Sequence, residues 1–168
     1  NIGRSIHSLA VNATNKFEET RLSVKDFINA KFKEEIIFTK NATEAINLVA
    51  ATFGQQNIKE GDEIIITELE HHSNYVPWHF LRKNKKAIIK FAPINEDGDI
   101  VIDKLRSLIS SRTKIIAVTH LSNVTGTIVP IKEIVELAHK KNIPVLVDGC
   151  QSVPHIDVDV TDLDCDFY

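Results

Sequence analysis

The sequence predicts an α/β fold in which a mostly parallel sheet lies between two layers of helices, a three-layer α/β/α arrangement. Short runs rich in isoleucine and valine alternate along the chain with segments of helical periodicity, which is the pattern of βαβ units. The runs are largely apolar, as expected of parallel strands that are buried on both faces of a sheet. No repeat, linker or low-complexity segment interrupts this order, so the 168 residues are expected to form one domain.

The first third of the chain should hold two helices and a strand. Apolar residues recur at three- and four-residue steps up to Ile28, which predicts an amphipathic helix that begins near residue 3. Residues 35–38 then read as a short strand. Residues 43–53 follow as a helix that ends at Gly54, a residue suited to a C-terminal cap.

The rest of the chain continues the alternation. The strands expected here span residues 63–67, 87–91, 114–119 and 144–147, and the helices span residues 75–83, 103–109 and 131–141. Pro77 falls in the first turn of its helix, Asp103 is expected to cap the next one, and Pro130 leads into the last. Asp97 and Gly98 mark a turn.

Composition excludes several classes of partner. Hydrophobic residues make up 43% and charged residues 26% of the chain, as in an ordinary globular protein. The net charge of −3 gives no basic face for nucleic acid or an anionic membrane. No apolar run approaches the ~20 residues that span a bilayer, and no signal peptide is recognisable, so a cytoplasmic location is expected. A disulfide between Cys150 and Cys165 is disfavoured in such a protein.

The chain contains no methionine, even at position 1. Together with the abrupt start of the first predicted helix, this predicts that the sequence is a fragment of a longer protein.

Four segments place polar residues after predicted strands, where ligands bind in open α/β sheets. The first is 39–45, in which a helix begins. Its free backbone N–H groups and the Thr43 hydroxyl would suit a phosphate. Simple helix capping by Asn41, with Glu44 three residues on, explains the same residues and is favoured on this segment alone. Neither a G-x-G-x-x-G nor a Walker A pattern occurs, which disfavours nicotinamide dinucleotides and P-loop nucleotides.

The second segment, 68–74, contains His71 and His72. An imidazole here could stack on an aromatic cofactor and exchange protons near neutral pH. A metal site that uses these residues and His79 is disfavoured, because adjacent histidines point apart and no standard zinc spacing is present. A surface histidine pair without a role is a further alternative.

The third and fourth segments are 120–126 and 148–151. Asn123 could contact a ligand oxygen through its amide, although such residues also make local turn hydrogen bonds. Asp148 ends a buried strand, where a carboxylate is costly unless it is paired. A protonated pyridine nitrogen would be a suitable partner, and Gln151 lies nearby in sequence. A magnesium ligand or a helix cap are the alternatives for Asp148.

Taken in order, these segments resemble the SufS-type cysteine desulfurases, which belong to the class V aminotransferase group of fold-type-I pyridoxal phosphate enzymes. The matching segments are 4–7, 42–50, 70–78, 119–126, 147–151 and 164–168. Segment 70–78, Glu-His-His-Ser-Asn-Tyr-Val-Pro-Trp, is the most specific, because it separates this branch from the NifS/IscS-type desulfurases.

The resemblance implies a role for each candidate residue. Thr43 and the backbone around Ala42 would hold the phosphate of pyridoxal 5'-phosphate. His71 would stack on the pyridine ring and assist proton transfer as the catalytic residue. Asn123 and Gln151 would contact the region of the ring hydroxyl oxygen, and Asp148 would pair with the ring nitrogen. No metal is implied.

Two positions depart from the family pattern. The family has Gly-Thr-Thr-Glu where this chain has residues 41–44, Asn-Ala-Thr-Glu, so one hydroxyl near the phosphate is missing. It has alanine at the position of Cys150, which is therefore expected to be a small buried filler and not the sulfur-carrying nucleophile.

The activity implied is the conversion of L-cysteine to L-alanine and an enzyme persulfide that supplies sulfur for iron–sulfur clusters. Residues 1–168 would be a single cofactor-binding large domain, cut before the Schiff-base lysine and the C-terminal small domain, and inactive alone. A homodimer and a sulfur-acceptor protein are the implied partners. The alternatives are a selenocysteine lyase or another class V enzyme, and a truncated module without catalytic function.

Overall fold

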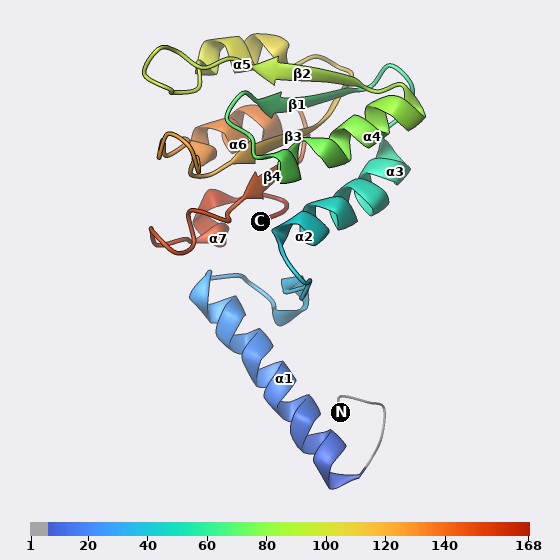
Figure 1. The fold of residues 1–168 in the computed structure, drawn as a ribbon, viewed down its shortest axis with the longest axis vertical. Helices are drawn as coiled ribbons and strands as arrows, with labels where there is room; N and C mark the ends of the chain where they lie inside the picture. The colour runs from blue at the N-terminus through green and yellow to red at the C-terminus, as the bar shows by residue number, and fades with distance from the viewer. Residues whose placement is uncertain (1–6) are drawn as a thin grey trace.

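Four parallel strands form the sheet in this computed structural model, which describes residues 7–168 (Figure 1). They are β1 (Glu63–Thr67), β2 (Ile88–Ala92), β3 (Thr113–Thr119) and β4 (Val145–Asp148), in the spatial order β2-β1-β3-β4. All three pairings are parallel, as predicted, and each predicted strand of this sheet lies within one residue of its observed bounds.

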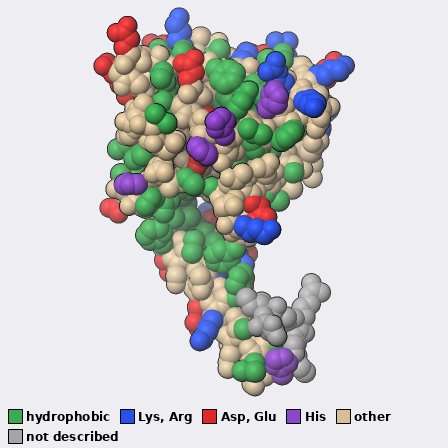
Figure 2. All heavy atoms as spheres, viewed as in Figure 1, with side chains coloured by type: hydrophobic (Ala, Val, Ile, Leu, Met, Phe, Trp, Pro, Cys, Tyr) green, Lys and Arg blue, Asp and Glu red, His purple; other side chains and the backbone are tan. Residues whose placement is uncertain are grey.

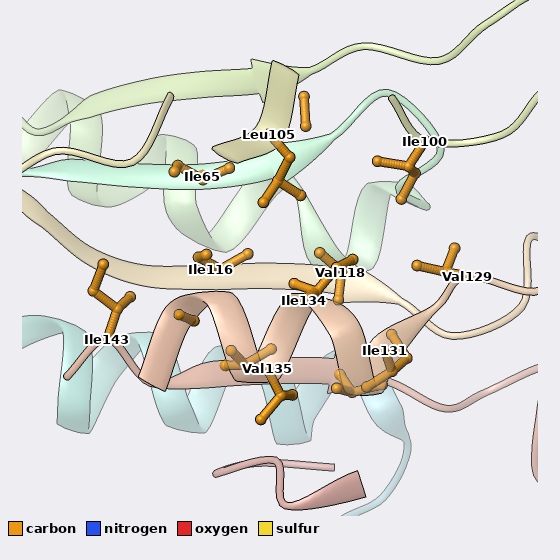
Figure 3. Packing of buried hydrophobic residues seen from close by; sticks show 14 of the residues in the cluster. Ile65, Ile100, Leu105, Ile116, Val118, Val129, Ile131, Ile134, Val135 and Ile143 are labelled. Carbon is orange, nitrogen blue, oxygen red and sulfur yellow. The ribbon is translucent and has the colours of Figure 1, made fainter. Parts of the chain in front are cut away.

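Helices cover both faces of the sheet. One face packs on α5 (Ile102–Leu108) and α6 (Ile131–His139), with Ile116 and Ile134 fully buried between the layers (Figure 3). The other face packs on α2 (Ala42–Val49) and α4 (Val76–Lys85), around the fully buried Trp78. Because successive side chains of a strand point to opposite faces, β1 and β3 contribute to the buried apolar clusters on both faces of the sheet. The predicted α/β/α arrangement is therefore confirmed.

The first helix, α1 (Ser8–Phe27), extends away from the layered body (Figure 1). Its predicted start near residue 3 lies outside the described residues. Among its described residues only Ala10 is buried, while Leu9 and Phe27 stay exposed. Figure 2 shows hydrophobic side chains gathered where α1 meets the body. The helix is thus anchored mainly at its C-terminal end, where the Arg21 guanidinium lies over the Phe38 ring.

The prediction of a strand at residues 35–38 is wrong. A 3₁₀ turn occupies Lys33–Glu35, and the chain beyond it is extended without pairing to any strand of the described residues. Ile36 is buried but Ile37 is 68% exposed. The Arg21 side chain donates to the carbonyl of Ile36, so this carbonyl has a hydrogen-bond partner without a neighbouring strand. The sequence favours an extended backbone here, but a strand also needs a neighbour.

The helix predicted to end at Gly54 continues past it. After α2, a π turn spans Ala50–Gly54, and α3 (Gln55–Asn57) continues the same helical run. Gly54 has ordinary right-handed helical angles, so it is not a C-terminal cap. A Cβ atom at this position would lie 2.6 Å from Cδ1 of Leu81 in α4. The glycine therefore permits two helices to approach closely.

The remaining element boundaries follow the predictions with small changes. Pro77 lies in the first turn of α4, and Gly98 occupies a turn with φ of +85°. Asp103 does not cap α5, whose N-cap is Val101; its carboxylate instead accepts from Arg106 at 3.1 Å. A short helix, α7 (Val160–Leu163), was not predicted. None of the described helices has the length and apolar character that crossing a membrane requires.

Candidate cofactor-binding site

The order of the connections reverses between β1 and β3, so the carboxyl ends of these two strands form the topological switch point of the sheet. The chain leaves β1 for α4 on one face of the sheet and leaves β3 for α6 on the other. Because the two connections diverge, the ends of these strands are the expected ligand site of an open α/β sheet. The polar segments singled out in the sequence follow β1, β3 and β4 at this edge (Figure 1).

Glu70 connects the segments that follow β1 and β3 at this point. Its Oε1 accepts from the Thr67 hydroxyl at 2.5 Å and from the backbone N–H of Thr119 at 2.9 Å, and its Oε2 accepts from the Asn74 amide at 2.6 Å. Burial, with a smaller contribution from the charge of Asp148, outweighs these hydrogen bonds and raises the pKa of Glu70 to about 7. The carboxyl group thus fixes the turn after β1 to the end of β3.

The same network reaches α4. Asn74 is fully buried, and its Oδ1 accepts from the indole N–H of Trp78 at 3.1 Å. Asn74 ends the 3₁₀ turn His72–Asn74, which directly follows His71. The 3₁₀ turn that follows His71 is therefore held in place through Asn74, which bonds to both Glu70 and Trp78.

His71 is linked to Thr43 through one hydroxyl. Ser73 Oγ lies 3.0 Å from His71 Nδ1 and 2.8 Å from Thr43 Oγ1. The backbone N–H of Ser73 also donates to His71 Nδ1, at 3.2 Å. The structure thus brings together two of the predicted site residues, which belong to segments far apart in the sequence.

The start of α2 keeps donors available for an anion. Asn41 caps the helix by accepting from the N–H of Glu44 at 2.9 Å, and the Glu44 carboxylate accepts from the N–H of Lys40 at 2.6 Å. The backbone N–H groups of Ala42 and Thr43 have no acceptor among the described residues. Capping, which the sequence favours, therefore does not compete with anion binding at this helix start, because the two would use different N–H groups.

Asp148 is a buried carboxylate without a cationic partner among residues 7–168. It is 7% exposed and lies beside Thr119 in the β3–β4 pairing. Its Oδ1 accepts from the N–H of Cys150 at 3.0 Å. A buried anion of this kind is costly unless a positive group or further donors satisfy it. The protonated nitrogen of a pyridine ring has the charge and donor geometry that this carboxylate lacks, so the residues present fit pyridoxal 5'-phosphate.

Tyr168 closes one side of the Asp148 turn. Its hydroxyl lies 2.6 Å from Ser152 Oγ and 3.1 Å from His120 Nδ1. Burial raises the pKa of Tyr168 to about 12, so the phenol stays protonated, and burial lowers the pKa of His120. The ring packs so closely on Gly149 that a Cβ there would lie 2.3 Å from Cε1 of Tyr168.

Asn123 and Gln151 are less constrained. Asn123 lies exposed in the loop after β3, and Gln151 lies in the turn after β4. Within the described part of the chain, neither side chain makes a hydrogen bond. The structure places both at the carboxyl edge of the sheet but does not join them to His71 or Asp148.

Cys150 corrects one expectation from the sequence. It was expected to be a buried filler, but it is exposed, because the turn after β4 directs it outward while its N–H binds Asp148. Partial desolvation of its sulfur and the neighbouring carboxylate of Asp148 both raise its pKa, which disfavours a thiolate. Both cysteines of the described chain are free, and no cluster of described residues could hold a metal ion.

Sequence reasoning assigned no role to Glu70 or Ser73. Glu70 belongs to the most specific motif, but nothing in its sequence position, six residues before α4, signals that its side chain reaches β3. Ser73 could have been noted as a hydroxyl two residues after a candidate histidine. Its contact with Thr43 depends on the fold alone.

The chain belongs to the aminotransferase class-V family, whose model matches residues 1–168. Its relatives are cysteine desulfurases. The chain is 49% identical over 168 residues to a probable cysteine desulfurase of Halalkalibacterium halodurans, covering all of this chain and 41% of the relative. It is also 49% identical to a cysteine desulfurase of Synechococcus elongatus, of which it covers 27%.

Solved structures agree with this assignment. The cysteine desulfurase CsdA from Escherichia coli superposes with a TM-score of 0.90 at 36% identity, over all of this chain and 42% of that one. The apo cysteine desulfurase from Thermococcus onnurineus NA1 gives a TM-score of 0.91 at 38% identity, over 97% and 40% of the two chains. The chain thus spans less than half the length of the proteins it matches.

Proposed function

We propose that this chain is the cofactor-binding part of a pyridoxal 5'-phosphate-dependent cysteine desulfurase, which converts L-cysteine to L-alanine and an enzyme-bound persulfide. The observation that carries the proposal is Asp148, a buried carboxylate at the end of β4 with no cationic partner in the described chain. The relatives named cysteine desulfurase support the substrate.

Each candidate residue has a task in this proposal. The N–H groups of Ala42 and Thr43, with the Thr43 hydroxyl, would bind the cofactor phosphate. Asp148 would hold the ring nitrogen in its protonated form. His71 would stack on the ring, and its Nε2 is the nitrogen left to exchange a proton, because Nδ1 faces the hydroxyl and the N–H of Ser73. Asn123 and Gln151 would contact the ring hydroxyl oxygen.

The bound cofactor would supply an electron sink for the substrate, which is strongest when its ring is cationic. Asp148 contributes by stabilising that positive charge in a site of low dielectric. Glu70 supports the site indirectly, since it accepts hydrogen bonds from Thr119 and Asn74 and so holds the turn beside His71 to the end of β3.

An Asp148→Asn variant of the full-length protein tests this proposal. The amide keeps the shape of the side chain but removes its charge, so the cationic ring loses its partner. Removing one member of a buried ion pair costs about 3–5 kcal/mol. We therefore expect a loss of about 10²–10³-fold in cysteine-dependent alanine formation. Asp162→Asn, at an exposed carboxylate paired with Lys132, is the matched control. Unchanged activity in Asp148→Asn would exclude the assigned role.

Residues 1–168 would form a single cofactor-binding large domain, with the Schiff-base lysine, the nucleophilic cysteine and a small domain supplied by further sequence. We therefore propose that residues 1–168 alone release no sulfide from L-cysteine, whereas the full-length protein does. The proposal also includes a homodimer, a sulfur-acceptor protein that feeds iron–sulfur cluster assembly, and a cytoplasmic location. Light scattering, transfer of ³⁵S from labelled cysteine, and cell fractionation test these three points in turn.

Two other functions are separated by the same assays. A selenocysteine lyase would release selenide from selenocysteine but little sulfide from cysteine. A binding module without catalysis would leave both substrates unchanged even when pyridoxal 5'-phosphate is bound.

A further inference from the structure

Ser73 occupies a position between two groups to which the proposed function gives different tasks. Its hydroxyl lies 2.8 Å from Thr43 Oγ1, on the phosphate side, and 3.0 Å from His71 Nδ1, on the ring side. Thr43 belongs to the first turn of α2, and Ser73 to the 3₁₀ turn after β1. A single hydroxyl therefore joins two elements that the chain keeps 30 residues apart.

The directions of these hydrogen bonds follow from one fixed donor. The backbone N–H of Ser73 can only donate, and it donates to His71 Nδ1 at 3.2 Å. Nδ1 therefore carries a lone pair, and the ring proton of neutral His71 resides on Nε2. The Ser73 hydroxyl must then also donate to Nδ1, which leaves its oxygen to accept from the Thr43 hydroxyl. All hydroxyl protons in this chain of atoms point from Thr43 toward His71.

This arrangement conflicts with anion binding by the Thr43 hydroxyl. A phosphate oxygen only accepts hydrogen bonds, so the Thr43 proton must turn toward it. Two oxygens 2.8 Å apart with no proton between them repel, so the Ser73 proton must then turn toward Thr43. The Ser73 oxygen is left to accept a proton from His71 Nδ1. Anion binding thus reverses both hydrogen bonds, and the reversed state requires a proton on Nδ1.

We propose that Ser73 is a positioning residue that couples occupancy of the phosphate site to the location of the proton on His71. The proposal rests on the proposed function, in which Thr43 binds the phosphate and His71 moves protons. Nδ1 gains its proton either by transfer of the ring proton from Nε2 or by uptake of one proton from water. The reversal breaks the 3.2 Å hydrogen bond from the Ser73 N–H to Nδ1 and forms a charge-assisted hydrogen bond from the Thr43 hydroxyl to the anion. The charge-assisted bond is the stronger of the two.

One departure noted in the sequence makes Thr43 more important in this turn. Ala42 stands where the family has a threonine, so Thr43 is the hydroxyl that remains in this turn. Ser73 provides a second hydroxyl at hydrogen-bond distance from it, but from a different element of the fold.

Imidazole ¹⁵N chemical shifts test the coupling, because they report which ring nitrogen carries the proton. The sample is the full-length protein labelled with ¹⁵N-histidine, at one fixed pH, without ligand, with inorganic phosphate, and with pyridoxal 5'-phosphate. The His71 signals are assigned from a His71→Gln variant. Binding of each ligand is measured separately by equilibrium dialysis. Ser73→Ala removes the hydroxyl, Ser73→Thr retains it, and Ser107→Ala removes an exposed hydroxyl of α5 that bonds only its own helix.

The expected result has three parts. Without ligand, the proton of neutral His71 lies on Nε2. Phosphate and pyridoxal 5'-phosphate move the Nδ1 signal of the wild type, Ser73→Thr and Ser107→Ala proteins toward the protonated value. In Ser73→Ala this movement is lost although both ligands still bind.

Three results would overturn the proposal. A ligand-free His71 protonated on Nδ1 contradicts the assigned directions, and a response that persists in Ser73→Ala excludes Ser73 as the link. In both cases retained ligand binding leaves the proposed function standing. Absence of binding by the wild type removes the phosphate site itself, and with it both proposals.

Discussion

The Glu70 carboxylate accepts the backbone N–H of Thr119 at 2.9 Å and so connects the turn after β1 to the last residue of β3. The connections that leave these two strands run to helices on opposite faces of the sheet, and this hydrogen bond links them where they separate. The charged neighbour that raises the pKa of Glu70 is Asp148, at the end of the next strand. The support of the His71 turn and the proposed partner of the cofactor ring therefore share one electrostatic environment.

We expect Glu70→Gln to destabilise the protein. A glutamine has one accepting atom where Glu70 uses two, so either the Thr119 N–H or the Asn74 amide loses its acceptor. Leaving a buried donor unsatisfied costs about 1–3 kcal/mol. Urea unfolding at pH 5, where the raised pKa keeps Glu70 protonated in the folded state and its ionisation does not offset the loss, measures this loss, with Glu68→Gln, an exposed neighbour, as control. Equal stability of Glu70→Gln and the wild type would show that the network contributes nothing.

The same residue should make stability depend on pH. The folded pKa of Glu70 is about 7, above the ordinary value of 4.5, so the folded state binds the proton more tightly than the unfolded state. Stability should therefore fall as pH rises from about 4.5 through 7, by at most about 3 kcal/mol. Unfolding free energies between pH 5 and pH 8 measure this slope. It should be shallower in Glu70→Gln, and an identical slope in both proteins would assign the effect to other groups.

Glu63 should have the opposite dependence. Burial alone would raise its pKa, but hydrogen bonds from Lys90, Ser110 and Arg112 outweigh burial and lower it to about 2. Its contribution is present above the ordinary value of 4.5 and is lost as pH falls toward 2. Glu63→Gln should therefore cost about 3 kcal/mol at pH 7 and progressively less in acid. Glu60→Gln, in an exposed pair with Lys86, should cost under about 1 kcal/mol. Unfolding curves at pH 7, 4 and 2.5 test whether the loss in Glu63→Gln shrinks in acid and whether it exceeds the loss in Glu60→Gln.

Gly149→Ala should disturb the turn that carries Asp148. The added methyl group would lie 2.3 Å from the Tyr168 ring, which must move away from Ser152 and His120. Overpacking of this kind costs about 1–3 kcal/mol, and thermal unfolding measures it. Cys150→Ala, at the exposed neighbouring position, is the control and should leave the melting temperature unchanged. A wild-type melting temperature for Gly149→Ala would mean that Tyr168 has room to shift.

His139 should stabilise the end of the chain only at lower pH. Its Nε2 lies 3.0 Å from Asp166, whose carboxylate also accepts from the Val145 N–H at the start of β4. This hydrogen bond raises the pKa of His139. The contribution is therefore full below about 6.5 and disappears as pH rises through the raised value. Because the pair is partly exposed, His139→Gln should cost under about 1 kcal/mol at pH 6 and nothing at pH 9. His155→Gln is the control, and a loss that persists at pH 9 would indicate packing, not charge.

The sequence by itself determined the layers and the order of elements. Runs such as Ile64–Ile66 and Val145–Val147 are apolar on both faces, which only a strand covered on two sides can satisfy. The N-termini of two helices, marked by Asn41 and Pro77, could also be predicted, because capping and proline geometry depend on local backbone chemistry. Asp148 could be singled out because a carboxylate that ends such a run must find a partner.

Only the tertiary structure decided features that depend on a neighbour from elsewhere in the chain. Residues 35–38 have strand-forming side chains but no strand to pair with among the described residues, and Gly54 serves contact with Leu81 and not helix termination. Glu70 reaches β3, and Ser73 joins Thr43 to His71, through contacts between segments 30 or more residues apart. Local propensity carries no information about such contacts, because they form only when the sheet order sets which strand ends meet.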